Sequence, residues 1–112
     1  MDNRISFDTV VEINDYFEKK SAEYWKALDL LIAVRMKNTL PIDNEDTELL
    51  RQQALYYSDL REKSGSYRSY RIWDSTLKDR CTFIRGWSEE SIHKCKENFI
   101  VARDVYYKEH ET

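Results

Sequence analysis

Residues 22–36 read AEYWKALDLLIAVRM, and they place apolar side chains on nearly every side of a helical wheel. Leu28 and Leu31 fall on one face of that helix, whereas Ile32 and Met36 fall on another. A helix that is apolar all round is buried among other elements, whereas a surface helix is apolar along one stripe only. The stretch therefore predicts a central helix, with Leu31 in the core, around which the rest of the chain packs.

The composition of the 112-residue chain is that of a globular domain with a core of its own. Hydrophobic residues make up 41% of the chain, which is enough for a core, while 35% charged residues indicate a solvated exterior. The longest unbroken apolar run, residues 30–34, is too short to cross a membrane. The first residues lack the basic and apolar regions of a secretion signal. We therefore expect one helical domain over residues 1–112, located in the cytoplasm and without membrane contact.

Helix-breaking residues are few. Pro41, Gly65 and Gly86 are the only prolines and glycines, and they divide the chain into four segments. No segment shows the alternation with period two that is typical of a strand. Helices are therefore expected at approximately 7–38, 43–64, 67–85 and 89–109. Their short connections favour an all-α fold, an antiparallel four-helix bundle with a long central first helix.

Local signals mark the expected helix ends. Ser6 or Asp8 can cap the first helix and Ser88 the last, because a short polar side chain accepts hydrogen bonds from the first backbone N–H groups. The first helix is expected to end near Asn38, and Gly65 is expected to end the second. The inner row of the last helix follows a spacing of three and four residues: Ile92, Cys95, Phe99, Ala102 and Tyr106.

Glu90 and His93 have the Glu-x-x-His spacing that helical bundles use in dinuclear metal sites. Such a site needs a second pair of the same kind, and His110, which directly follows Glu109, does not provide one. The two cysteines fall at core positions of predicted helices, where a thiol packs as a small hydrophobe: Cys81 and Cys95. We therefore expect no metal, no cofactor and two reduced thiols, as is usual in the cytoplasm.

Arg103 and His110 lie about two helical turns apart on one face, in the sequence RDVYYKEH. This spacing resembles the Arg-x(4–6)-His signature of the HEPN ribonucleases, a family of helical bundles. The resemblance covers the eight residues RDVYYKEH and implies an RNA-cleaving enzyme whose paired arginine and histidine act at a dimer interface. An exposed helix end that frays is the alternative interpretation of the same residues.

Residues 61–71, between the second and third predicted helices, are expected to form a loop rich in basic and aromatic side chains. These side chains are Arg61, Lys63, Tyr67, Arg68, Tyr70 and Arg71. Arginine pairs with phosphates and tyrosine stacks on bases, but the same residue types also dominate protein interfaces. Because the net charge is -3, a protein surface is favoured over nucleic acid, and a simple solvated turn stays open as a third interpretation.

Adjacent tyrosines occur twice, at residues 56–57 and 106–107. If one ring of each pair faces the core, the other must lie near the surface, where exposed tyrosine is typical of an interface. We therefore expect Tyr57 and Tyr107 to contribute to partner contacts.

The sequence favours a small non-catalytic cytoplasmic binding protein, an adaptor or inhibitor that covers a surface on a larger protein partner. A homodimer is a further expectation, because the first helix is longer than the helices predicted to cover it and carries apolar side chains at both ends. The alternatives are a nucleic-acid-binding protein that uses residues 61–71 and a HEPN-like ribonuclease that uses Arg103 and His110.

Overall fold

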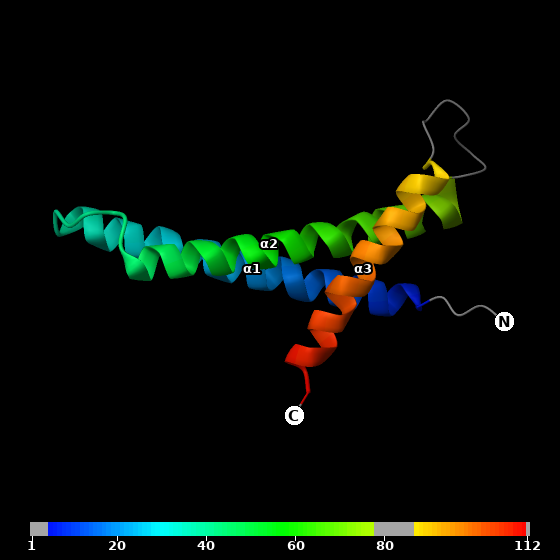
Figure 1. Ribbon diagram of the computed structural model, residues 1–112, viewed down its shortest axis with the longest axis horizontal. Helices are drawn as coiled ribbons and strands as arrows, with labels where there is room; N and C mark the ends of the chain where they lie inside the picture. The colour runs from blue at the N-terminus through cyan, green and yellow to red at the C-terminus, as the bar shows by residue number, and fades with distance from the viewer. Residues whose placement is uncertain (1–4, 78–86, 112) are drawn as a thin grey trace.

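The computed structural model describes residues 5–77 and 87–111, and across both ranges the fold is all-α. Helix α1 spans Phe7–Lys37, α2 spans Glu45–Ile72, and α3 spans Glu89–Glu109. A π-helical segment, η1 at Trp73–Leu77, follows α2 without a break. The helices α1 and α2 form an antiparallel hairpin, and α3 crosses it near the end that carries the start of α1 (Figure 1). Within the described ranges there are three α-helices, and a four-helix bundle is not seen.

The helices begin where the capping signals predict. The Ser6 hydroxyl accepts a hydrogen bond from the Thr9 backbone N–H at 3.2 Å, and the Ser88 hydroxyl accepts one from that of Ser91 at 3.1 Å. At the start of α2, Asn44 and Thr47 form a reciprocal capping box. The helix α1 ends with Asn38 as its C-cap, at the predicted position.

The turn between α1 and α2 contains one residue in the left-handed region. Thr39, directly after the C-cap, has a φ of 57°. This conformation lets the Leu40 backbone N–H bond to the Arg35 carbonyl at 2.9 Å and so closes the end of α1. Glycine is the residue that usually occupies this position, because a β-branched side chain is strained there.

The predicted helix end at Gly65 is wrong. The helix α2 continues through Gly65 to Ile72, so that residues 61–71 form helix rather than the expected loop. Gly65 does not have a positive φ, and a Cβ built on it would lie 3.4 Å from the Asn14 Nδ2. This distance is an ordinary contact, so the close packing of α1 does not require a glycine here, and the packing of α2 against α1 offsets the low helix propensity of glycine. The rest of the helix expected at 67–85, with Cys81, extends beyond the described residues.

Small polar residues contribute to the contact between α1 and α2. The Asn14 Nδ2 donates to the Ser64 hydroxyl at 3.1 Å, and the Ser21 and Ser58 hydroxyls lie 2.7 Å apart. The Trp25 indole N–H also donates to Ser58, at 2.8 Å. In the part of the chain that the structure describes, no buried side-chain nitrogen or oxygen lacks a hydrogen-bond partner. These directional bonds fix the register of the hairpin because any slip would leave buried polar groups unpaired.

The hydrophobic core lies at the crossing of the three helices. Its buried members are Val10, Ile13, Phe17, Tyr57, Leu60, Tyr67, Tyr70, Cys95, Phe99 and Ala102. The Tyr67 ring stacks on the Phe99 ring with their centroids 4.6 Å apart. The predicted inner row of the last helix is therefore the row that α3 buries, and Ile92 and Tyr106 pack against the same core.

The prediction that residues 22–36 form the centre of the fold is wrong. Leu28 is the single buried residue in that stretch, and Leu31 is only half-buried. Leu30, Val34 and Met36 are each more than half exposed. The reason is that α3 packs across the first half of α1, so that, of the described helices, only α2 covers the second half (Figure 1). Among the described helices, none combines the length and the apolarity that a membrane span requires.

Candidate interaction surface

The basic residues of the 61–71 segment are mostly engaged within the molecule. The Arg71 Nη1 donates to the Ile5 carbonyl at 2.6 Å, and its guanidinium lies 5.6 Å from the centre of the Tyr67 ring. Arg68 donates to Asn14 at 3.1 Å and forms an ion pair with Asp15 at 3.3 Å. These contacts hold α2 against α1 and the segment before it, so the two arginines have a structural role. Lys63 pairs with Asp59 one turn away, and Arg61 is exposed.

The tyrosines predicted to contact a partner divide into two groups. Tyr57, Tyr67 and Tyr70 are buried in the core of this chain. Tyr107 is 49% exposed, and so is Tyr56, at 48%, the neighbour of Tyr57. In the first adjacent pair, then, Tyr57 is the inward ring and Tyr56 the surface ring. The structure does not bring the eight predicted partner-binding residues together on one surface.

Two tyrosine hydroxyls meet the carboxylate of Glu109 at the end of α3. Tyr16 on α1 donates to it at 2.7 Å, and Tyr57 on α2 donates to it at 2.8 Å. Burial raises the pKa of both tyrosines above the usual value of 10, and the hydrogen bond to the Glu109 carboxylate raises it further. The carboxylate thus joins the last turn of α3 to both helices of the hairpin.

Arg103 and His110 both have partners within α3. The Arg103 guanidinium forms an ion pair with Asp104 at 3.2 Å. The His110 Nδ1 lies 2.7 Å from the Tyr106 carbonyl. The His110 ring packs against the rings of Tyr106 and Tyr16, with ring centroids 4.1 and 4.7 Å away. The arrangement holds the imidazole against the surface of the bundle. A ribonuclease role for these two residues stays a prediction.

The described residues contain no group of three or more histidine, cysteine or carboxylate side chains that could hold a metal ion. His93 pairs with Glu97 at 2.9 Å on the exposed side of α3. Cys95 is buried, and burial raises the pKa of its thiol, which favours the protonated, unreactive form.

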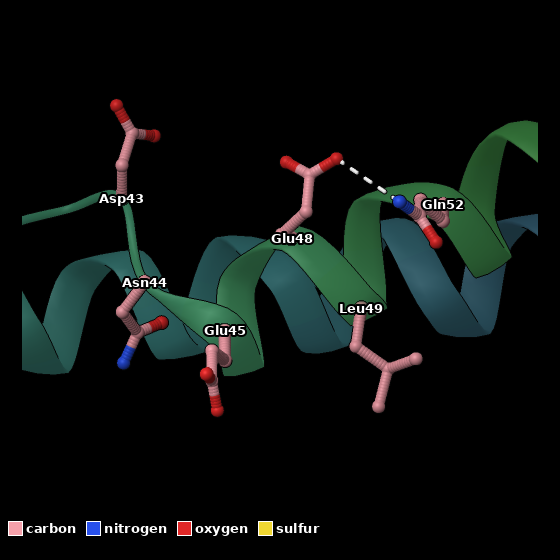
Figure 2. Close-up of a pocket in the computed structure, with 6 residues that line it drawn as sticks. All are labelled: Asp43, Asn44, Glu45, Glu48, Leu49 and Gln52. Atoms are coloured by element: carbon pink, nitrogen blue, oxygen red, sulfur yellow. Dashed lines mark hydrogen bonds between the residues drawn. The ribbon is translucent and has the colours of Figure 1, made fainter.

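An open depression of about 560 Å³ lies at the start of α2, beside the turn. Figure 2 shows that its lining side chains do not converge: Asp43 and Glu48 extend to one side of the helix, and Glu45 and Leu49 extend to the other. Glu48 accepts a hydrogen bond from Gln52 at 3.3 Å. Because no cluster of polar groups points to a common centre, we assign no ligand to this depression.

Beyond α3, the hairpin has an uncovered apolar face. The helix α3 contacts α1 through Tyr16, whose ring lies 5.2 Å from that of Tyr106, and it contacts α2 through the stack of Tyr67 on Phe99. Residues three or four positions apart lie on the same side of a helix. The side of α1 that carries Tyr16 and the side of α2 that carries Tyr67 therefore continue along the hairpin beyond α3. We call these two lines of side chains the contact rows. They reach residues that α3 does not cover: Ala27, Leu30, Leu31 and Val34 on α1, and Leu49, Gln53 and Tyr56 on α2. We call these residues the open face.

The open face has an exposed apolar rim and a partly buried base. The exposed fractions of the rim residues are 59% for Leu30, 54% for Val34, 58% for Leu49 and 48% for Tyr56. The residues between them are half-buried: Ala27, Leu31 and Gln53. Scattered exposed leucines are ordinary in proteins, but an apolar set on two adjacent helices is a candidate interaction surface.

The two borders of the open face differ in charge. On the α1 side, Lys26 precedes Leu30 by one turn and Lys37 follows Val34 by one turn. On the α2 side, Glu45 precedes Leu49 by one turn. The α1 border as a whole consists of Lys19, Lys20, Lys26 and Lys37 with Glu23, and the α2 border consists of Glu45, Asp46 and Asp59 with Lys63. Because Asp59 pairs with Lys63, the surface is basic along α1 and acidic at the start of α2.

Sequence reasoning found the apolar character of residues 22–36 but assigned it to the core, and it missed Leu49 and Tyr56 as surface residues. The signal in the sequence was the apolar row of Leu49, Tyr56 and Leu60 on the second predicted helix. In the structure Leu60 belongs to the core at the crossing of α3, whereas Leu49 and Tyr56 are exposed. Compared with known protein families, with curated proteins and with solved structures, the chain matches none of them.

Proposed function

We propose that this protein is a small non-catalytic binding protein, an adaptor or inhibitor, that covers a surface on a larger protein partner with its open face. The observation that carries the proposal is the exposed rim of Leu30, Val34 and Leu49, together with Tyr56. An exposed tyrosine such as Tyr56 is typical of the energetic centre of a protein interface, and the aliphatic side chains extend the apolar area beside it. Charged residues border this centre, as polar rims do in known interfaces.

The proposal places the protein in the cytoplasm, and the buried, unpaired thiol of Cys95 supports a reducing compartment. It also differs from the nucleic-acid alternative in the surface that it uses. Arg68 and Arg71, which that alternative needs, already pair with Asp15 and the Ile5 carbonyl.

The proposal is tested by replacing single residues with a photo-crosslinking amino acid in the cells from which the protein comes. Leu49 lies on the open face, whereas Leu55 lies on another side of the same helix and is similarly exposed, at 58% against 53%. We expect a discrete protein adduct from position 49, lost when Val34→Lys is added, and none from position 55. Equal adducts from both positions, or none from either, would contradict the proposal.

A further inference from the structure

We infer that the occupant of the open face is a single amphipathic helix of a partner protein, acidic along the side that meets α1 and basic along the side that meets α2. This inference rests on the proposed function and specifies its partner. Two observations support it. The contact rows of α1 and α2 already pack against α3, and the two borders of the open face carry opposite charges.

A helix suits the open face in its chemistry, because the hairpin already packs its apolar side chains against one. The helix α3 lies across α1 and α2 with Phe99 on Tyr67 and Tyr106 on Tyr16. The open face continues the same two rows with aliphatic and aromatic side chains, so a second helix that lies along the hairpin, rather than across it as α3 does, contacts apolar side chains of both α1 and α2. The partner would then supply the fourth helix that the described part of this chain does not contain.

The length of the charged border sets the length of the occupant. From Lys19 to Lys37 the axis of α1 rises by about 27 Å, which corresponds to a partner helix of about 18 residues. A depression of about 190 Å³, lined by Tyr16, Lys19, Lys20 and Glu23, lies at the end nearest α3. Its two lysines favour an acidic side chain on the occupant at that end.

Charge fixes the direction of the bound helix. Turning a helix end to end on the face exchanges the sides that meet α1 and α2. An occupant with carboxylates on one side and amines on the other therefore satisfies Lys26 and Lys37 in one direction only. In the opposite direction it sets its amines against these lysines and its carboxylates against Glu45, which is repulsive.

A second copy of this chain fits the open face less well. If the two-fold axis runs along the hairpin, α1 meets the acidic α2 of the other copy, but both α3 helices then lie between the hairpins at the same end. Each helix is about 10 Å thick, so they hold the two faces apart. If the axis runs across the hairpin, the lysine row of α1 lies opposite itself. Like charges then meet along the α1 border.

The test uses two synthetic 18-residue peptides with leucines along one side of the helix. The first has glutamates on one flank and lysines on the other, and the second has these flanks exchanged. Each carries a spin label at its N-terminus, and NMR line broadening of the full-length protein reports where the label lies. We expect both peptides to bind in opposite directions, so that one label broadens resonances near Asn38 and the other broadens resonances near Tyr57.

Leu49→Glu should weaken binding of either peptide about tenfold or more, whereas Leu55→Glu should leave it unchanged. If both labels broadened resonances at the same end of the hairpin, or at both ends equally, charge would not set the direction of the bound helix. That result would overturn the inference. Failure of both peptides to bind would overturn the inference, and so would a dimer in sedimentation equilibrium that Leu49→Glu dissociates. If neither peptide bound but position 49 still crosslinked to a partner protein, the proposed function would stand. Only the helical occupant would then be excluded.

Discussion

The Tyr57 hydroxyl on α2 donates a hydrogen bond to the Glu109 carboxylate on α3 at 2.8 Å, across 52 positions of the chain. Tyr16 on α1 donates to the same oxygen at 2.7 Å. One carboxylate therefore joins all three helices at the point where α3 leaves the hairpin and the open face begins. This junction makes the stability of the fold depend on the protonation of two tyrosines.

Alkaline pH should destabilise the protein through Tyr16 and Tyr57. The folded-state pKa of each lies above the unfolded value near 10, so the folded chain retains these protons to a higher pH than the unfolded chain. Their contribution to the free energy of unfolding is complete below pH 10 and is lost as the pH rises from there through the folded-state pKa. Urea titrations between about pH 8 and about pH 11.5 measure this loss.

The control for this prediction is the variant that combines Tyr16→Phe with Tyr57→Phe. It should be less stable at neutral pH because it lacks both hydrogen bonds, and its stability should fall less steeply above pH 10. An identical alkaline decline in the wild type and the variant would show that other groups cause it.

Gly65→Ala should stabilise the protein by about 0.5–1 kcal/mol. The position is helical, and the new methyl group would lie 3.4 Å from the Asn14 Nδ2, an ordinary contact distance. Gly65→Val is the matched comparison, because its larger side chain must displace Asn14 from Ser64 and should destabilise. Urea denaturation of both variants checks this, and a loss of stability in Gly65→Ala would mean that the contact between α1 and α2 tolerates no added atom.

Thr39→Gly should stabilise the protein by about 0.5–1 kcal/mol, because it removes the steric strain of a φ of 57° while it costs some backbone entropy. Thr39→Ala keeps the Cβ and should give no such gain. Thermal denaturation of the two variants separates strain from other effects of losing the threonine hydroxyl. Equal stability of both variants would argue against strain at this turn.

Leu28→Ala should cost about 2–4 kcal/mol, whereas Leu31→Ala, one turn further along α1, should cost only about 1 kcal/mol. Leu28 is 4% exposed and packs against α2, while Leu31 is half-buried in the base of the open face. Denaturant titration of the two variants measures the difference. If Leu31→Ala lowered the free energy of unfolding as much as Leu28→Ala, residues 22–36 would belong to the centre of the core, contrary to this structure.

The helix ends were predictable because their signals are local. Ser6, Asn38 and Ser88 act within one turn of their own helix, so their neighbours in sequence suffice to identify them. Gly65 was misread because α2 continues past it through packing against α1, which is distant in sequence. A glycine that ends a helix and a glycine inside a packed helix look alike in one sequence.

The candidate surface was misassigned for a related reason. Periodicity shows that residues 22–36 are apolar on all sides, but it does not show how many helices pack against them. Only the crossing point of α3, set by contacts such as Tyr67 on Phe99, determines that α3 leaves Leu30 and Val34 exposed. For the same reason Tyr67 and Tyr70, predicted to contact a partner, belong to the core.

Because the core lies at one end of the hairpin, the backbone should open unevenly. Amide hydrogens near Leu60 and Phe99 should exchange with solvent only through global unfolding, whereas those near Leu30 and Leu49 should exchange through local opening of the hairpin tip. Opening of the tip need not disturb α3. A ligand on the open face would then slow exchange at the tip and leave the crossing unchanged, so exchange rates would reveal an occupied surface before its partner is known.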